Sequence, residues 1–443
     1  MTTRPLSSSI NLSSAKRALK AADGQYYDYY AAYSSAFVAD ILEHFNLTAD
    51  DRILDPWNGS GTTTKVAGSR GLCAVGYDKN PVMTVVAKAG LADANAIVQS
   101  IGAQCQAIVE EALDLPDIWS QACLRNDALY WWFSPPTIVY WRKLEWALQR
   151  QLIYRNQRDT YQPVAEWANP DDISPLAAFF YVAAFRAVRS HLTVSHFASS
   201  NPTWIKIARR GQWRLYVEQE EVLQSFRESV DSLKQRLLSS FNREEHLDVA
   251  IETRCSTHLP LPDESISAVI TSPPYCTRID YAVATRPELA FFGFTKTLFD
   301  NLRRQMMGTT TVAEMSPKII EEWGKTCLQT LAQIENHHTV ASSTYYIKNI
   351  AQYFDALFRS MMEIDRVLVA GGQCGFVVQD SHYKDVHIDL SHIVEEMALA
   401  LNWQIIGRST YKVVNNFGSI NNRSKRYRAT SYATECAVVL QKK

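Results

Sequence analysis

A Ser272-Pro273-Pro274-Tyr275 tetrapeptide carries the clearest chemical signal in this chain of 443 residues. It follows an apolar run, residues 266–270, that is typical of a buried strand. A serine hydroxyl and a proline carbonyl can accept two N–H bonds from an amino group conjugated to an aromatic ring, which frees the nitrogen lone pair for attack. The two prolines hold the backbone still, and Tyr275 offers a flat face for an extruded base. The pattern therefore indicates methylation of such an amine, although a Pro-Pro turn is also ordinary loop chemistry.

A glycine-rich turn far upstream has the composition of a ligand-binding loop. It reads Asp55-Pro56-Trp57-Asn58-Gly59-Ser60-Gly61-Thr62 and lies between a short apolar run and a helix-like segment. The glycines allow the backbone to approach a ligand closely, and the helix that follows presents free N–H groups. A second short strand ends at Asp78, and an acidic side chain about 20 residues after such a turn suits the hydroxyl groups of a ribose. The sequence has no Gly-Lys-Ser/Thr phosphate loop, which disfavours a nucleoside triphosphate. The competing interpretation is a tight turn between packed elements, with Asp78 capping a helix.

Together the two segments resemble the S-adenosylmethionine-dependent DNA amino-methyltransferases. In that family a D-P-F-x-G-x-G-T segment binds the cofactor, and a (D/N/S)-P-P-(Y/F/W) segment holds the target amine. Here Trp57 replaces the usual Phe, and Thr271 completes the T-S-P-P-Y form that is common among enzymes acting on the N4 amine of cytosine. The resemblance covers about half of the chain, residues 26–95 and 250–443. It implies S-adenosylmethionine as cofactor, no metal, and double-stranded DNA with a flipped-out base as substrate.

The resemblance also assigns roles to individual residues. Ser272, Pro273, Pro274 and Tyr275 are the expected catalytic residues. The family often has an acidic residue that binds the cofactor's adenine, but Cys255 occupies that place here and is a poor acceptor. Glu252 is close enough in sequence to be the true acceptor. The expected cofactor-binding residues are Tyr33, Ser34, Asp55, Pro56, Trp57, Asn58, Gly59, Ser60, Gly61, Thr62, Asp78 and Cys255.

The pattern of strands and helices predicts an α/β fold of the class I methyltransferase, Rossmann-like type. We expect a mostly parallel sheet with a terminal antiparallel hairpin, plus a mostly helical insertion. Residues 26–95 and 246–443 form the expected catalytic domain, and residues 96–245 form the insertion and the candidate region for target recognition. A smaller polar insertion spans residues 297–345. Since ligands bind beyond the carboxyl ends of parallel strands, the glycine-rich turn, Asp78 and the Ser-Pro-Pro-Tyr turn should meet at one edge of the sheet.

Two further segments are predicted to begin helices. Ser34 or Ser35 is placed to cap a helix with apolar residues at helical spacing. Ser134-Pro135-Pro136-Thr137 repeats the Ser-Pro-Pro sequence but lacks the terminal aromatic residue. We interpret this other copy as a helix start, because proline is favoured in the first turn.

Composition constrains the function class. The hydrophobic content of 47% and the charged content of 21% are typical of a globular protein. With a net charge of −1, DNA contacts must come from local basic patches. The eight cysteines contain no C-x-x-C pair, which favours reduced thiols in the cytoplasm and argues against structural zinc. The polar start of the chain lacks a secretion signal, and the longest apolar run, 176–185, is too short to span a bilayer, so it predicts a buried helix.

Three basic clusters are candidates for DNA contact. The first combines Lys206, Arg209 and Arg210 with nearby tryptophans. The second, Arg423, Lys425 and Arg426, lies in the expected final hairpin loop. The third lies in the helical insertion. Its members are Arg142, Lys143, Arg150, Arg155 and Arg158.

Several alternatives stay open at this point. The same chemistry suits the N6 amine of adenine, or the N2 amine of guanine in RNA. The chain could also be a non-catalytic nucleic-acid-binding subunit that keeps a methyltransferase fold. A cognate restriction endonuclease or another defence-system subunit is a possible partner, and no membrane is expected. Asp380 suits either the target pocket or a turn cap equally well, and the histidines show no metal-ligand spacing.

Overall fold

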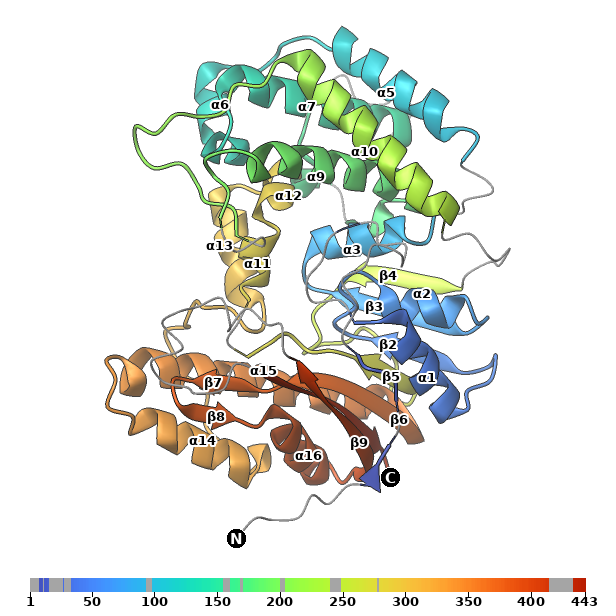
Figure 1. Ribbon diagram of the computed structural model, residues 1–443, viewed down its shortest axis with the longest axis vertical. Helices are drawn as coiled ribbons and strands as arrows, with labels where there is room; N and C mark the ends of the chain where they lie inside the picture. The colour runs from blue at the N-terminus through green and yellow to red at the C-terminus, as the bar shows by residue number, and fades with distance from the viewer. Residues whose placement is uncertain are drawn as a thin grey trace.

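The structure is a computed structural model that describes residues 8–10, 12–15, 27, 33–92, 98–153, 160–167, 170–199, 204–239, 248–276, 279–413 and 433–443. It has a lower lobe built on a β-sheet and an upper lobe of helices (Figure 1). The upper lobe consists largely of the segment between β3 and β4, which interrupts the sheet in sequence but not in space.

The main sheet has eight strands in the order β1-β9-β10-β6-β5-β2-β3-β4. β4, β3, β2, β5 and β6 run parallel to one another, while β10 runs antiparallel between β6 and β9. This is a class I methyltransferase fold, so the expected α/β class, the mostly parallel sheet and the antiparallel terminal pair are confirmed. A separate hairpin pairs β7 with β8. The strands are β1 Ser8–Ser9, β2 Arg52–Asp55, β3 Cys73–Asp78, β4 Val249–Thr253, β5 Ile266–Thr271, β6 Leu368–Gln379, β7 Ser381–Tyr383, β8 Val386–Ile388, β9 Gln404–Val413 and β10 Ala433–Gln441.

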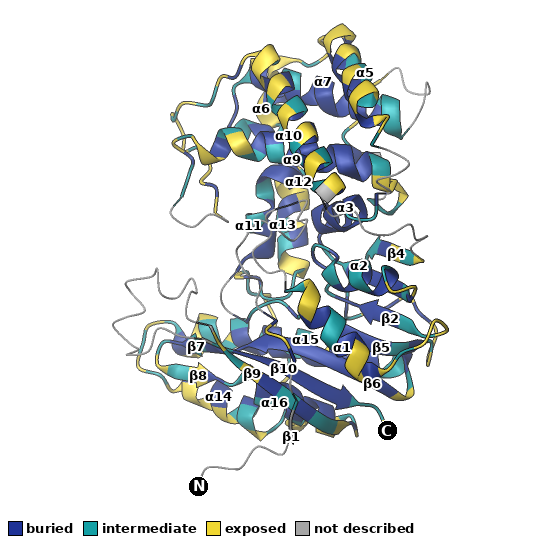
Figure 2. Ribbon diagram, turned by 45° about the vertical axis from the view of Figure 1, so that its right-hand side comes forward, coloured by how far each residue is buried: buried dark blue, intermediate teal, exposed yellow. Residues whose placement is uncertain are grey.

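Helices cover both faces of the sheet, and the sequence explains why. Successive residues of a strand point to opposite faces, so a strand that is apolar throughout needs cover on both sides. Ile53 packs on one face beneath α1 (Ser35–Phe45) and α2 (Thr62–Gly68). Its neighbour Leu54 packs on the other face, in a core that includes α14 (Lys325–Glu335), α15 (Ile347–Val367) and α16 (Leu390–Ala400). The central strands are therefore buried on both faces (Figure 2).

The upper lobe has its own hydrophobic core, which also includes helices from outside the predicted insertion. α3 (Pro81–Ala89) contributes Val82 and Val86 to this core, and α13 (Lys296–Gln305) contributes Phe299. These helices join the two lobes. The remaining helices are α5 Ile101–Asp114, α6 Gln121–Asn126, α7 Pro135–Leu152, α8 Val164–Trp167, α9 Pro175–Thr193, α10 Gln219–Ser239, α11 Tyr281–Ala284 and α12 Arg286–Phe291, with 3₁₀ turns at Ala128–Trp131, Pro170–Asp172 and Glu321–Trp323 and a π turn at Ser342–Tyr346.

Local expectations for three helices are confirmed. The Ser34 hydroxyl accepts the Phe37 N–H at 3.1 Å and caps α1. Ser134 precedes α7, whose first residue is Pro135, so this copy of Ser-Pro-Pro begins a helix. The apolar run at 176–185 lies in α9 and is buried. In the part of the chain that the structure describes, no helix has both the length and the apolar character needed to cross a membrane.

In the third basic cluster, Arg142 and Lys143 are buried, so neither offers a free cation to DNA. Arg142 is only 1% exposed, forms an ion pair with Asp127 at 2.7 Å, and donates to the carbonyls of Ala290 and Phe291 in α12. A buried guanidinium needs such partners, because an unpaired charge in the core is very costly. Lys143 and Arg150 form ion pairs with Asp117 and Glu111. Arg155 and Arg158 lie outside the described residues.

Candidate active site

A cavity of about 300 Å³ opens at the carboxyl ends of the parallel strands. The glycine-rich turn after β2, Asp78 at the end of β3 and the Ser-Pro-Pro-Tyr turn after β5 all line it, so the three features meet at one edge of the sheet. Residues 304–309, which include the end of α13, and polar residues of α15 form further parts of the wall. This volume is at the lower end of the range for small-molecule sites.

Asp55 does not line the cavity, but it connects the glycine-rich turn to the residue before the Ser-Pro-Pro-Tyr turn. Its carboxylate is 1% exposed and accepts the Thr271 hydroxyl at 2.6 Å, the Trp57 N–H at 3.2 Å and the Tyr33 hydroxyl at 3.0 Å. Burial raises the pKa of Asp55, and these hydrogen bonds oppose the shift. Because Thr271 immediately precedes Ser272, the Asp55 carboxylate fixes the glycine-rich turn relative to the Ser-Pro-Pro-Tyr turn.

Close packing explains one glycine of the turn and one on the neighbouring strand. Gly61 has φ +82°, and a Cβ there would lie 2.9 Å from the Ala87 side chain. At Gly76, on the neighbouring strand, a Cβ would lie 2.5 Å from the Asn58 side chain. Larger residues would displace the turn from β3. Gly61 therefore packs against α3, outside the cavity lining, while residues 56–60 and Thr62 line it.

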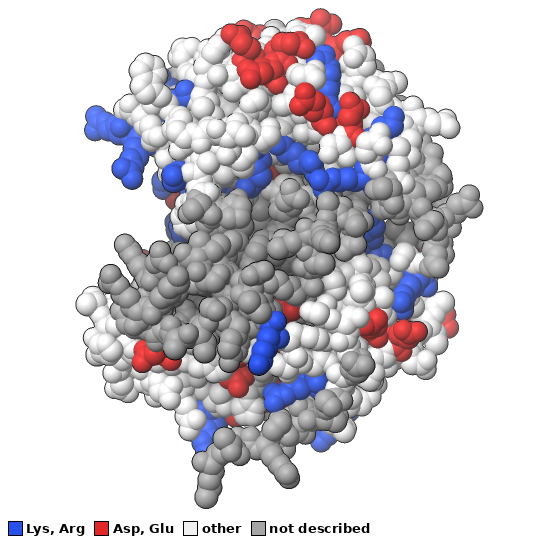
Figure 3. Space-filling model, viewed as in Figure 1, with Lys and Arg blue, Asp and Glu red and all other residues white. Residues whose placement is uncertain are grey.

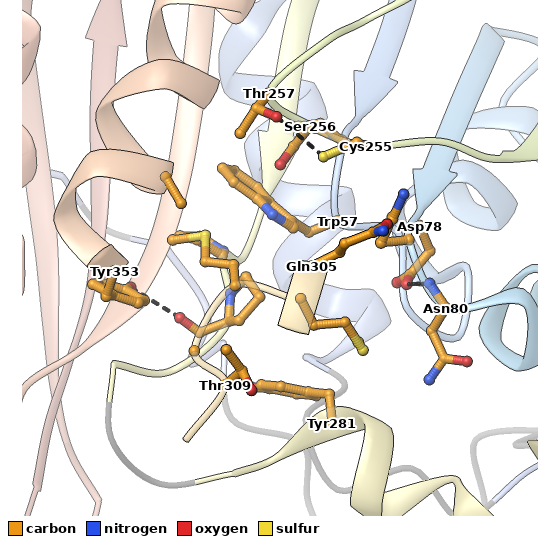
Figure 4. Close-up of a pocket in the computed structure, with 18 of the residues that line it drawn as sticks. Trp57, Asp78, Asn80, Cys255, Ser256, Thr257, Tyr281, Gln305, Thr309 and Tyr353 are labelled. Carbon is orange, nitrogen blue, oxygen red and sulfur yellow. Dashed lines mark hydrogen bonds between the residues drawn. The ribbon is translucent and has the colours of Figure 1, made fainter. Parts of the chain in front are cut away.

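Asp78 lines the cavity, and each oxygen of its carboxylate accepts a backbone hydrogen bond. One oxygen accepts the Gly59 N–H at 2.9 Å, and the other accepts the Asn80 N–H at 2.8 Å. Each oxygen keeps a further lone pair that can accept a ligand hydroxyl. Burial raises the pKa of Asp78 to about 6, against the lowering effect of the two backbone hydrogen bonds. Figure 4 shows Asp78 and Asn80 on one side of the cavity, with Gln305 and Trp57 beside them.

Two buried tyrosines hold the Ser-Pro-Pro-Tyr turn. The Tyr353 hydroxyl, from α15, donates to the Pro274 carbonyl at 2.9 Å (Figure 4). The Tyr275 N–H donates to the Tyr281 hydroxyl at 3.1 Å. Ser272 and Pro273 both line the cavity, and among the described residues neither the Ser272 hydroxyl nor the Pro273 carbonyl has a hydrogen-bond partner. The turn is thus rigid, and two hydrogen-bond acceptors remain for a ligand.

The sequence analysis missed these tyrosines and the wall formed by residues 304–309. One available signal was the spacing of Asn349, Gln352, Tyr353 and Ala356, which lie on one face of α15 and line the cavity. That spacing alone is typical of any amphipathic helix, so it did not indicate a site.

Not all of the predicted cofactor residues line the cavity. Tyr33 does, whereas the Ser34 hydroxyl caps α1 and donates to the Ser14 carbonyl at 2.9 Å. Cys255 lines the cavity beside Ser256 and Thr257, with its sulfur 3.1 Å from the Thr257 hydroxyl (Figure 4). Glu252 does not line it.

Glu252, the alternative acceptor considered from sequence, forms an ion pair with Arg254 at 2.8 Å. Asp380 also lies away from the cavity lining, and its carboxylate contacts the His387 ring at 2.8 Å. Within the described ranges, no group of three or more His, Cys, Asp or Glu side chains has a metal-binding arrangement.

The predicted DNA-contact residues fall in two places. Lys206, Arg209 and Arg210 lie on the segment between α9 and α10, where they are exposed. Arg423, Lys425 and Arg426 lie outside the described residues. Their role therefore stays a prediction.

Comparison with known proteins adds one relative. No protein-family model matches the chain. The chain is 23% identical over 315 residues to the Type II methyltransferase M.BsoBI of Geobacillus stearothermophilus. The match covers 67% of this chain and 57% of the relative, so the chain spans a little over half the length of the protein it matches.

Proposed function

We propose that this chain is a DNA methyltransferase that transfers a methyl group from S-adenosylmethionine to the exocyclic N4 amine of cytosine. The observation that carries the proposal is the single cavity that joins Asp78 and the glycine-rich turn to the Ser-Pro-Pro-Tyr turn. The class I methyltransferase fold and the similarity to a Type II methyltransferase support it. Double-stranded DNA is the proposed substrate, and a cognate restriction endonuclease is a proposed partner.

The residues of the cavity fit the cofactor. When bound, S-adenosylmethionine supplies an electrophilic methyl group carried on a sulfonium. The free lone pairs of the Asp78 carboxylate suit the two ribose hydroxyls, and the close packing around Gly61 and Gly76 keeps the turn in place beside them. Ser256 and Thr257 lie beside Cys255 in the cavity wall. Their hydroxyls would form the hydrogen bonds to the adenine that an acidic residue often forms in this family.

The Ser-Pro-Pro-Tyr turn prepares the target amine. The Ser272 hydroxyl and the Pro273 carbonyl accept its two N–H bonds, which frees the nitrogen lone pair, while the Tyr275 ring stacks on the flipped base. The nitrogen takes the methyl group and loses one proton to solvent water. Orientation by these groups supplies up to about 7–11 kcal/mol of the barrier reduction. No covalent bond between enzyme and base is required.

The decisive experiment is incubation of the full chain with methyl-labelled S-adenosylmethionine and, in parallel reactions, mixed-sequence duplex DNA or structured RNA, followed by nucleoside analysis. We expect labelled N4-methylcytosine. Labelled N6-methyladenine would keep the methyltransferase assignment and overturn the choice of base, and label in RNA guanine alone would overturn DNA as substrate. Calorimetry with S-adenosylmethionine separates an inactive scaffold, which need not bind it, from an enzyme given the wrong DNA.

Cofactor binding should weaken at acid pH because of Asp78. Its carboxylate, with a pKa raised to about 6 by burial, is the form that accepts both ribose hydroxyls. Binding is therefore complete above pH 7 and weakens as the pH falls through 6, by up to about tenfold per pH unit. Calorimetric titrations from pH 5 to 8 measure this. Asp78→Asn, which cannot titrate, should bind weakly with no such dependence; a sloping profile for that variant would assign the effect to another group.

Tyr353→Phe should slow transfer without weakening cofactor binding. The substitution removes only the hydroxyl that donates to Pro274, and a hydrogen bond of this kind is worth about 0.5–1.5 kcal/mol, or roughly 2- to 10-fold in kcat. The KM for S-adenosylmethionine should be unchanged. Tyr383→Phe is a matched control, because Tyr383 is also buried but its hydroxyl contacts Thr339 instead of the turn. Equal losses in the two variants would assign the effect to general packing.

A further inference from the structure

A tight turn between α9 and α10 presents a tryptophan to solvent. We call residues 208–215 the Trp213 turn. Its tip contains Gly211 at φ +78°, and the Gln212 N–H donates to the Arg209 carbonyl at 3.1 Å. The Arg209 N–H donates in turn to the Gln212 side chain at 3.0 Å. Trp213 is 87% exposed, which is unusual for the largest apolar side chain in a folded protein.

Both sides of the Trp213 turn are anchored to the upper lobe. The Ala208 N–H donates to the Trp131 carbonyl at 2.9 Å, and the Leu215 N–H donates to the Trp132 carbonyl at 2.8 Å. Next to Trp213, the Arg214 guanidinium lies over the Tyr130 ring at 4.4 Å and donates to the Tyr130 carbonyl at 2.9 Å. The exposed indole therefore stands on a braced turn, so little conformational entropy is lost when a partner covers it.

The cations of this turn differ from two ion-paired arginines of the upper lobe. Arg142 and Arg189 are committed to ion pairs in the core, at 2.7 and 2.6 Å from carboxylates. Arg209 and Arg210 are exposed, and in the described part of the chain no carboxylate pairs with either. On the face drawn in Figure 3, acidic residues gather at the top of the upper lobe and basic residues lie along its lower margin, which faces the lower lobe. Cations without a carboxylate partner can neutralise phosphates, and an exposed aromatic ring beside them can stack on a base, which together suit a nucleic acid.

The Trp213 turn is linked to the cavity wall through Trp131 and α13. The segment that includes the turn runs down the side of the upper lobe toward α13 (Figure 1). Trp131, which anchors the turn, contacts Phe299 of α13 at 5.8 Å between ring centroids. Gln305, at the end of the same helix, lines the cavity. Phe299 and Gln305 are about 9 Å apart along the helix axis, so the helix that packs against the anchor of the turn also supplies part of the cavity wall.

We propose that the Trp213 turn is an additional contact with duplex DNA, in which the Trp213 indole stacks on bases and Arg209 and Arg210 bind the adjacent phosphates. This inference rests on the proposed function, because it takes DNA as the ligand. Stacking on a base is sequence-tolerant, so the turn stabilises the distorted duplex near the target base without reading its sequence.

The test is the binding of a fluorescein-labelled 40-base-pair duplex of mixed sequence, measured by anisotropy at 50–200 mM NaCl. Trp213→Ala should weaken binding about 10- to 100-fold, because one stacked aromatic is lost. The slope of log affinity against log salt should stay unchanged, since no charge is removed. Trp213→Phe should restore most of the affinity. Arg209→Ala combined with Arg210→Ala should reduce the magnitude of that slope by about 1.8, roughly 0.9 for each phosphate contact.

A matched control separates this effect from loss of exposed apolar surface in general. Val194 is 88% exposed beside the C-terminal end of α9, and Val194→Ala should bind the duplex as the wild type does. All variants should keep wild-type affinity for S-adenosylmethionine, which checks that they are folded. If the wild type binds the duplex and Trp213→Ala binds it equally tightly, this inference is overturned while the proposed function stands. A wild type that binds no duplex at all would overturn both.

Discussion

Ser272→Ala is expected to lower kcat for methyl transfer by about 100- to 1000-fold, the usual cost of removing one pre-positioned hydrogen-bonding group from a reacting centre. Ser272 lines the cavity and its hydroxyl has no partner among the described residues, so the hydroxyl is available to accept the amine N–H. Cofactor affinity should not change, because the hydroxyl acts on the other substrate. Single-turnover transfer to DNA and calorimetry with S-adenosylmethionine measure the two quantities separately.

The chain contains its own control for this variant. Ser134 begins another Ser-Pro-Pro sequence, but it starts α7 in the upper lobe and does not line the cavity. Ser134→Ala should leave transfer at the wild-type rate, although it changes the same local sequence. A Ser272→Ala enzyme with wild-type kcat would remove the hydroxyl from the mechanism. Tyr275→Ala, which removes the stacking ring, should likewise reduce transfer and leave cofactor binding intact.

Asp78→Ala is expected to reduce affinity for S-adenosylmethionine by at least about 100-fold. Hydrogen bonds to a charged acceptor are worth about 1.5–3 kcal/mol each, and the carboxylate has room for two ribose hydroxyls. The substitution also removes the acceptor for the Gly59 N–H, so part of the loss comes from a less ordered turn. Isothermal titration calorimetry at pH 8, where the wild-type carboxylate is charged, gives the affinity directly.

The matched control for this variant is Asp50→Ala. Asp50 is exposed and precedes β2, and it does not line the cavity. Its replacement should leave cofactor affinity unchanged. A thermal melt of each variant checks folding. Asp78→Ala with wild-type affinity and a normal melt would show that the cofactor does not bind at the end of β3, which would remove the basis of the proposed function.

Comparison of sequence and structure shows which features depend on local chemistry. The strands of the sheet follow from apolar runs, and the start of α7 follows from Pro135 and Pro136 in its first turn, because propensity and turn chemistry act over a few residues. The meeting of Asp78 with the Ser-Pro-Pro-Tyr turn follows from topology, since parallel strands end at one edge of the sheet. For the same reason the fold class was predictable without any long-range contact.

Only the tertiary structure decided which polar side chains support the site. Tyr353 reaches Pro274 from 79 residues away, and Arg142 reaches the carbonyls of α12 from 148 and 149 residues away. Neither contact has a local signature, because the spacing around Tyr353 is that of any amphipathic helix and the residues around Arg142 are typical of a solvated basic cluster. A charged or hydroxyl side chain is buried or exposed according to what packs against it, and that depends on segments far apart in sequence. The sequence alone determined that the two motifs and Asp78 meet at one edge of the sheet, and tertiary packing decided which residues hold them in place.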